Sequence, residues 1–144
     1  MSKVIKILPL QDTFKIPTYS HIGDAGLDLF SVETITICPM ERIKIGCGFA
    51  IEIPEGYLGA IAPRSGLAYK YGLTVLNAWG VIDSSYRGEV SVILINLGSE
   101  QIKLEKNSKI AQLIIVPYEN AELSIMQVLT ATDRGVNGFG SSGN

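Results

Sequence analysis

The stretch "GVIDSSYRGEVSVILIN", residues 80–96, decides the fold because a polar turn separates two apolar segments. Residues 80–82 are apolar, and residues 89–96 are rich in Val and Ile, as strands are. The turn carries more chemistry than a chain reversal needs, since a single Gly or Asx residue suffices. Its side chains are those of Asp83, Ser84, Ser85, Tyr86 and Arg87. The stretch therefore predicts a strand-turn-strand unit with reactive groups at its tip.

Similar apolar segments recur along the chain and are separated by turn residues such as "PEG" (54–56) and "EKNS" (105–108). They predict strands over residues 3–8, 34–38, 48–53, 57–62, 73–76, 89–96, 101–104, 109–118 and 122–128. Strands at a spacing of about 8 to 12 residues are typical of antiparallel sandwiches, jelly rolls and barrels. We therefore predict an all-β fold. Both faces of Val90–Ile95 are largely apolar, which predicts cover on each side by another sheet or another subunit.

Two segments break the strand pattern. "SGLAYKYG" (65–72) has helix formers between two glycines and predicts one short helix over residues 65–71, with Ser65 as its N-cap and Gly72 as its stop. "TATDRGVNGFGSSGN" (130–144) is rich in glycine and has no strand period, which predicts a flexible Gly-rich C-terminal arm over residues 131–144. With no internal repeat, residues 1–144 are expected to form a single domain.

Composition excludes several classes of function. Apolar residues make up 47% of the 144 residues and charged residues 18%, so the chain is expected to fold. A net charge of −2 argues against a broad basic surface for nucleic acid. Cys38, Cys47 and His21 are too few for a zinc site and are read as two plain strand residues and a loop histidine. Without a leader-like or membrane-spanning apolar run, we expect a cytoplasmic protein with no membrane partner.

Three segments carry candidate binding chemistry. Arg64 and Ser65 begin the expected helix, where free N–H groups favour an anion, although on this segment alone an ordinary N-cap beside a surface Arg is the commoner explanation. In an extended segment Asp28 points away from Leu27 and Leu29. Its carboxylate either holds a magnesium ion or the waters of that ion, or is a solvated strand residue. Gln112, inside an apolar strand, is either a core amide or a phosphate donor.

The polar turn and the arm carry the remaining candidates. Asp83 is able to orient a water molecule and Tyr86 to support a sugar, although each alone fits an Asx turn or packing. The arm offers Arg134 and the hydroxyls of Ser141 and Ser142 among glycines, whose N–H groups can fold around phosphate oxygens. Its large ring, at Phe139, gains nothing in solvent but can stack on a base.

Taken in order, five segments resemble the motifs of the homotrimeric dUTP diphosphatases (dUTPases), over about residues 17 to 143 of the chain. They are "AGLDLFS", "PRSGLA", "GVIDSSYRGE", "IAQLII" and "RGVNGFGSSG". The resemblance implies a distorted jelly-roll-like β-barrel and a homotrimer with its active sites at subunit interfaces. It also implies Mg²⁺-dependent hydrolysis of dUTP to dUMP and pyrophosphate, which keeps uracil out of DNA and supplies dUMP for thymidylate synthesis.

The resemblance assigns roles to individual residues. Asp83 would be the general base that orients water toward the α-phosphorus, Tyr86 would pack on deoxyribose, and Asp28 would hold Mg²⁺ through water. Uracil would be read by Asn77 and by the hairpin backbone at Gly80, Val81 and Ile82. The phosphates would be contacted by Arg64, Ser65, Gly66 and Gln112. The arm would contribute Arg134, Phe139, Gly140, Ser141 and Ser142.

Some residues depart from the family pattern. Trp79 stands where many members have Pro, which affects the uracil hairpin or a subunit contact. Lys109 stands where Arg is frequent and weakens the expectation of a local ion pair. Two alternatives were weighed: a dCTP deaminase of the same fold, which needs an acid in the strand after Glu89, and a non-enzymatic jelly-roll binding module, which does not explain the five motifs together.

Overall fold

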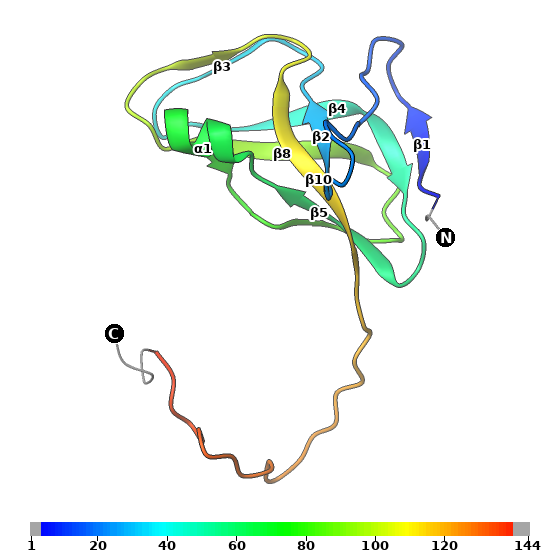
Figure 1. The fold of residues 1–144 in the computed structure, drawn as a ribbon, viewed down its shortest axis with the longest axis vertical. Coiled ribbons are helices and arrows are strands. Elements are labelled where there is room, and N and C mark those ends of the chain that lie inside the picture. Colours follow the sequence, from blue (N-terminus) through cyan, green and yellow to red (C-terminus); the bar gives the residue numbers. More distant parts are fainter. Residues whose placement is uncertain (1–3, 140–144) are drawn as a thin grey trace.

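The computed structural model describes residues 4–139, which form short strands and one helix (Figure 1). The helix, α1, spans Ser65–Tyr71. The strands are β1 (Lys6–Pro9), β2 (Gly26–Phe30), β3 (Ile35–Ile37), β4 (Arg42–Glu52), β5 (Tyr57–Ala62), β6 (Leu73–Val75), β7 (Gly80–Ile82), β8 (Glu89–Asn96), β9 (Ile102–Leu104) and β10 (Lys109–Pro117).

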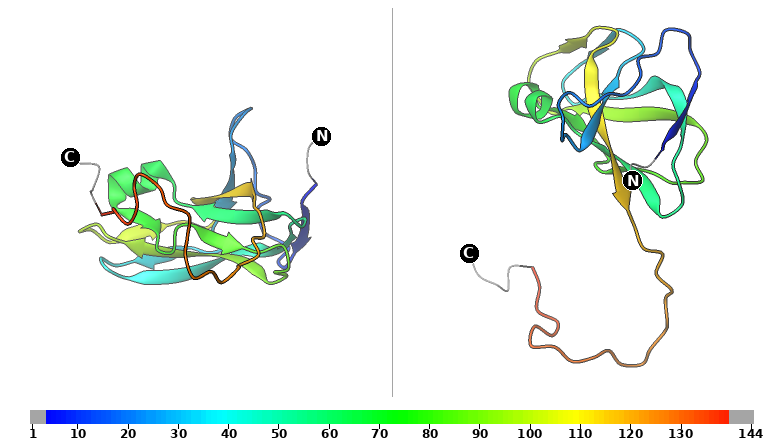
Figure 2. Two further views of the ribbon diagram at one scale, coloured as in Figure 1. Left: turned by 90° about the horizontal axis from the view of Figure 1, so that it is seen from below. Right: turned by 45° about the vertical axis from the view of Figure 1, so that its right-hand side comes forward.

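The strands form two four-stranded sheets and a two-stranded ribbon. One sheet has the order β1-β4-β8-β6, the other has the order β2-β10-β5-β7, and β3 pairs with β9. Every pairing is antiparallel, and the strands stack in layers (Figure 2). The predicted all-β, jelly-roll-like fold is confirmed, although the described strands do not close into a continuous barrel.

The core lies between the layers and follows the alternation of β8. Val90, Val92 and Leu94 are each 1% exposed, so one face of this strand is fully buried. The opposite face, Ser91, Ile93 and Ile95, is only half-buried in the single chain. The predicted cover on both faces is therefore incomplete within one chain, because the second sheet packs on one face only.

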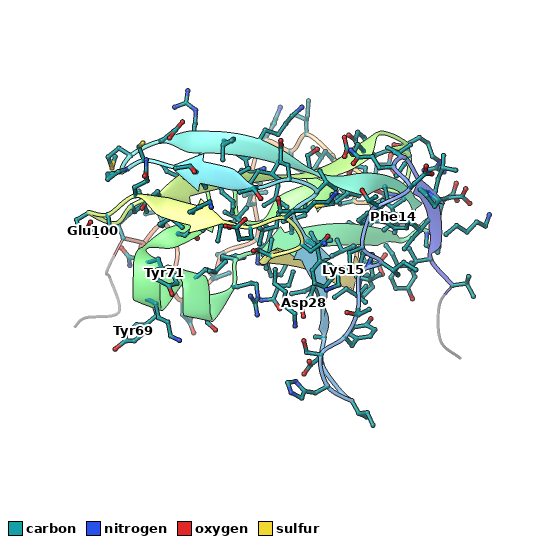
Figure 3. All side chains as sticks on the ribbon, turned by 90° about the horizontal axis from the view of Figure 1, so that it is seen from above. Phe14, Lys15, Asp28, Tyr69, Tyr71 and Glu100 are labelled. Carbon is teal, nitrogen blue, oxygen red and sulfur yellow. The ribbon has the colours of Figure 1, made fainter. Side chains whose placement is uncertain are left out.

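The N-terminal segment before β2 closes one side of the core. The rings of Phe14 and Phe49 lie 6.0 Å apart, centroid to centroid, and the Lys15 ammonium lies 4.4 Å from the centroid of Phe30 (Figure 3). Nearby, Cys47 is buried in β4, and burial together with the charge of Glu89 raises the pKa of its thiol to about 12. This thiol is unreactive at neutral pH, in line with the prediction of a plain strand residue.

The helix ends as expected but begins differently. Gly72 has φ 69° and donates its N–H to the carbonyl of Ala68, and a Cβ there would meet the backbone of Gly98. The prediction of Ser65 as the N-cap is wrong. The N-cap is Arg64, whose side chain makes no capping hydrogen bond within the described part of the chain, and Ser65 is the first helical residue. Arg64 has extended backbone angles, φ −94° and ψ 125°, and the helix begins one residue earlier than a Ser65 cap requires.

Strand predictions failed at three places. One is β2, Gly26–Phe30, which was not among the predicted strands. Strand β4 begins at Arg42, well before the predicted 48, because the Gly46–Gly48 interruption is a β-bulge and not a strand end. Residues 122–128 are described and form no strand, since the chain leaves the body after β10 and runs on as an extended coil (Figure 1). In the described residues no helix is long and apolar enough to cross a membrane.

Candidate active site

A cavity of about 370 Å³, here called the α1 pocket, lies where the start of α1 meets β2 and β10. It is lined by Ser20, His21, Asp24, Ala25, Gly26, Asp28, Arg64, Ser65, Gly66, Gln112 and Ile114. The pairing of β2 with β10 places Asp28 opposite Gln112, so both side chains leave the same face of the sheet. The antiparallel register therefore brings together two of the predicted motifs that lie far apart in the sequence.

Asp28 is the electrostatic centre of the α1 pocket. Its Oδ2 accepts hydrogen bonds from Ser20 Oγ and from Lys109 Nζ, each at 2.6 Å, and its Oδ1 lies 3.6 Å from Arg64 Nε. The residue is only 7% exposed, which excludes the interpretation of Asp28 as a solvated strand residue. The ion pair with Lys109 forms although this position departs from the family pattern.

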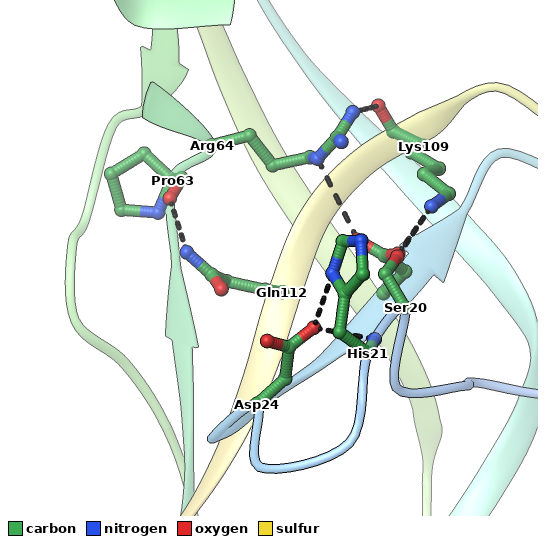
Figure 4. A network of polar contacts seen from close by, with 8 residues as sticks. Ser20, His21, Asp24, Pro63, Arg64, Lys109 and Gln112 are labelled. Carbon is green, nitrogen blue, oxygen red and sulfur yellow. Dashed lines mark hydrogen bonds and ion pairs between the residues drawn. The ribbon is translucent and has the colours of Figure 1, made fainter. Parts of the chain in front are cut away.

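The ionisation of Asp28 follows from these contacts. Burial acts to raise the pKa of the carboxyl group. The hydrogen bonds from Lys109 and Ser20 and the positive charges of Lys109 and Arg64 together outweigh burial, so the pKa lies below its ordinary value of 3.8. Asp28 is therefore a fixed negative charge at neutral pH that holds two cations at the mouth of the pocket, with Lys109 bonded to Ser20 as well (Figure 4).

We expect Asp28→Asn to destabilise the protein by about 1–3 kcal/mol at neutral pH, because two cations then lose their counter-charge. A carboxyl group with a lowered folded-state pKa stabilises the fold above its unfolded pKa, and this contribution disappears as the pH falls through the folded-state value. The difference in urea unfolding free energy between the two proteins should therefore persist from pH 7 to about pH 4 and vanish below it.

Glu52→Gln is the matched control for this prediction. Glu52 pairs with Lys6 at 2.6 Å on an exposed surface, where such pairs contribute little. If Asp28→Asn and the wild type have the same unfolding free energy at pH 7, the ion pairs of Asp28 with Lys109 and Arg64 do not stabilise the fold as proposed.

Gln112 is held in the same pocket. Its Nε2 donates to the carbonyl oxygen of Pro63 at 2.9 Å (Figure 4), and its Oε1 occupies the space that a Cβ at Gly26 would need. The side chain is half-buried, and the amide nitrogen carries a second N–H. Gln112 thus has a satisfied structural bond and a remaining donor beside the predicted phosphate contacts Ser65 and Gly66, both exposed.

A second cavity, of about 220 Å³, lies beside the segment from Asn77 to Tyr86 and is called the hairpin pocket after the expected uracil hairpin; in the structure β7 pairs with β5 and not with β6 or β8. It is lined by Lys44, Ile61, Asn77, Gly80, Val81, Ile82, Tyr86, Glu89, Val90, Ser91 and Ile93. Gly80 allows the close approach of its neighbours, since a Cβ there would meet Ile61 at 3.3 Å and the Asn77 amide at 3.4 Å. All the predicted uracil-reading residues line this pocket, whereas Trp79 is 58% exposed and is not among the described lining residues.

The polar turn, residues 83–88, is closed by hydrogen bonds that do not involve the Asp83 carboxylate. The Tyr86 N–H donates to the carbonyl of Asp83 at 3.1 Å, and the Arg87 guanidinium donates to the carbonyls of Ser84 and Tyr86 at 2.6 and 2.8 Å. Arg87 therefore fixes the turn. The Asp83 side chain is exposed at the tip, beside the pocket that Tyr86 lines.

The described lining residues of the two pockets do not overlap. The described part of the arm, residues 131–139, lies away from the two sheets in the single chain (Figure 1), and Arg134 donates to the carbonyl of Asn137 within the arm itself. Phe139 is fully exposed, and the predicted contacts Gly140, Ser141 and Ser142 lie outside the described residues. One chain therefore presents the predicted site in separate parts.

Sequence reasoning did not identify three residues as part of the site: Ser20, Lys109 and Glu89. Ser20 and Lys109 contact Asp28, and Glu89 lines the hairpin pocket. Lys109 lies 81 positions from Asp28, so only the β2–β10 register shows the contact. Glu89 carried a signal, since an acid at the first position of an otherwise apolar strand needs a partner.

Fold and pockets together define a class: a jelly-roll-like protein with a cation-lined pocket at a helix start and a separate pocket beside the turn that carries Asp83. The profile of the dUTPase family matches residues 12–143. The chain belongs to the dUTPase family, and this assignment favours the hydrolase over the deaminase and the binding module.

Curated relatives and solved structures agree with the family. The deoxyuridine 5'-triphosphate nucleotidohydrolase of Clostridium novyi is 55% identical over 128 residues, covering 89% of this chain and 90% of the relative. That of Clostridium acetobutylicum is 48% identical and covers 96% of each chain. A structure of the Staphylococcus bacteriophage 80alpha dUTPase with dUpNHpp has a TM-score of 0.87 and 30% identity, covering 99% of this chain and 100% of the other.

A further solved structure carries information on a metal. The dUTPase of phage phi11 of S. aureus, described with a structural Mg(II) ion, has a TM-score of 0.79 and 27% identity and covers 88% of this chain and 98% of the other.

Proposed function

We propose that this protein hydrolyses dUTP to dUMP and pyrophosphate through attack of water on the α-phosphorus. The observation that carries the proposal is the exposed Asp83 carboxylate in a turn whose Tyr86 lines a pocket of about 220 Å³. Hydrolysis at phosphorus requires positioning and charge neutralisation more than covalent chemistry. Asp83 orients the water and accepts its proton, and Tyr86 supports the deoxyribose.

The α1 pocket is proposed to hold the phosphates. Arg64 and Lys109 bring two positive charges, and Asp28 removes one of them. This balance cannot neutralise a triphosphate of about four negative charges, so further cations must join it. Arg134 and a magnesium ion are the proposed sources, while Ser65, Gly66 and Gln112 supply neutral donors.

The donor set of the pocket allows magnesium only as an ion bound mainly by substrate. The described residues contain no cluster of three or more His, Cys, Asp or Glu side chains suited to hold a metal, and the Asp28 carboxylate already faces two cations. Mg²⁺ retains several waters and binds through few carboxylates plus substrate phosphates. The Asp28 carboxylate would accept hydrogen bonds from the waters that such an ion retains. When bound, Mg²⁺ would supply charge that neutralises the phosphates.

The proposed assembly is a homotrimer that shares each site between subunits. Two observations support sharing: the two pockets have no lining residue in common, and the described residues 131–139 of the arm lie away from the two sheets (Figure 1). Leu123 and Ile125 are 92% and 100% exposed, which is costly for a chain left in water. The 14 residues from 131 to 144 can span roughly 46 Å at about 3.3 Å per residue, enough to reach a neighbouring subunit. The proposed location is the cytoplasm, with neither nucleic acid nor membrane as partner.

Product identification tests the proposed reaction. The protein is incubated with dUTP, dCTP and UTP in the presence of Mg²⁺, and the products are separated by ion-exchange chromatography. We expect dUMP and pyrophosphate from dUTP alone. Ammonia released from dCTP would instead establish the deaminase, and no turnover of any nucleotide would favour the binding module.

We expect UTP to be hydrolysed at least about 100-fold less efficiently than dUTP, since a packed pocket that excludes a hydroxyl discriminates by this order. The proposed reason is that the Tyr86 ring, which lines the hairpin pocket, packs on the deoxyribose and leaves no room for a 2′-hydroxyl. The measurement is kcat/KM for both nucleotides. Equal values would remove Tyr86 from this role.

A further inference from the structure

We propose that Glu89 is a positioning residue that holds Tyr86 in the pose that distinguishes deoxyribose from ribose. This inference rests on the proposed function and adds to it a residue outside the catalytic turn. Glu89 is half-buried, begins β8 and lines the hairpin pocket together with Tyr86. Two contacts of this one residue, made by its side chain and by its main chain, carry the argument.

The side chain of Glu89 is anchored on the bulge of β4. Pairing between β4 and β8 shifts register between Gly46 and Ala50, and Ala50 lies opposite Glu89. The Glu89 Oε1 accepts the N–H of Gly48 at 2.8 Å, inside this bulge. A β-bulge leaves its extra residue without a partner in the strand ladder. The Glu89 carboxylate supplies the acceptor that the Gly48 N–H would otherwise lack.

Both glycines of the bulge accommodate this anchor. A Cβ at Gly46 would overlap the Glu89 carboxylate, so glycine leaves the space that the side chain fills. Gly48 has φ 77°, a conformation that side chains rarely adopt. Gly46 therefore leaves room for the Glu89 side chain, and Gly48 donates its N–H to that side chain from a left-handed backbone conformation.

The main chain of Glu89 holds Tyr86. The Tyr86 phenol donates to the carbonyl of Glu89 at 3.0 Å, which ties the ring back onto the first residue of β8. The ring lies against Gly88, where a Cβ would overlap the phenol. Tyr86 is 45% exposed as a whole residue. These contacts, and not burial, therefore decide the orientation of its ring.

The two contacts are coupled because they belong to one residue. Loss of the carboxylate frees the first residue of β8 from the bulge, and the carbonyl that receives the phenol is then free to move. Tyr86 would lose its fixed pose, and the space it denies to a 2′-hydroxyl would open. A residue with only a structural role would instead slow both nucleotides by the same factor.

The test compares kcat/KM for dUTP and UTP in Glu89→Ala, Glu89→Gln, Tyr86→Phe and the double variant Glu89→Ala/Tyr86→Phe. We expect Glu89→Ala to lower the ratio of dUTP to UTP about tenfold, the factor that corresponds to about 1.4 kcal/mol. Glu89→Gln should keep the ratio, since its amide oxygen still accepts the Gly48 N–H. In the Tyr86→Phe background the added effect of Glu89→Ala should be smaller, because both changes act on one bond.

An unchanged ratio in Glu89→Ala would overturn the inference, as would equal ratios for Glu89→Gln and Glu89→Ala or strictly additive effects. If Glu89→Ala does not fold, Glu89→Asp keeps the charge but shortens the reach, and the same fall in ratio is expected. Failure of the wild type to hydrolyse dUTP would refute the proposed function. A wild type that prefers dUTP, with variants that keep the preference, would refute only the role of Glu89.

Discussion

The Asp83→Asn variant is expected to bind dUTP with nearly unchanged affinity and to lose about 100-fold or more in turnover, as removal of a positioned general base does. An amide keeps the shape and polarity of the side chain but cannot accept the proton of the attacking water. The turn itself should be preserved, because it is closed by main-chain bonds and by Arg87 and not by the Asp83 carboxylate. Calorimetry with dUTP and kcat at saturating substrate separate binding from turnover.

Ser85→Ala is the matched control, since Ser85 is an exposed residue of the same turn with no assigned role. Its turnover should equal that of the wild type. Asp83→Asn with wild-type turnover would show that another group orients the water.

Truncation after Asp133 is expected to leave a folded protein of unchanged oligomeric state with about 100-fold lower kcat/KM, because the truncation removes Arg134 and the closing ring of Phe139. The body should not be destabilised, since residues 134–137 are exposed and Arg134 bonds only within the arm in the described structure. Thermal unfolding, sedimentation and dUTP kinetics give the three readouts.

The single substitution Phe139→Ala provides a graded control for this prediction. It removes the ring and keeps Arg134, so an intermediate loss is expected. A truncated protein that retains wild-type kcat/KM would show that the arm takes no part in the reaction.

Local patterns predicted the parts of this fold that local physics determines. The alternation of β8 and the limits of β5 follow from residues that contact the core, and the αL conformation of Gly72 follows from a stop that only glycine allows without strain. The start of β4 was missed because glycines at 46 and 48 suggest a strand end, and only pairing with β8 reveals a bulge.

The site was predictable by residue type but not by arrangement. The five motifs indicated which side chains matter. The ion pair between Asp28 and Lys109, by contrast, depends on the register of β10 against β2. Residues 122–128 have the composition of a strand, yet a strand needs a partner and the single chain offers none in its described part.

Subunit mixing tests the central claim, a site shared between chains, most directly. The Asp83→Asn chain supplies an intact arm, and the chain truncated after Asp133 supplies an intact turn, while each is expected to be nearly inactive alone. After unfolding together and refolding at equal amounts, the whole mixture should recover about a quarter of wild-type turnover, since turn and arm are drawn independently from the two chains. A mixture that stays as inactive as its components would show that turn and arm act within one chain, and would contradict the account.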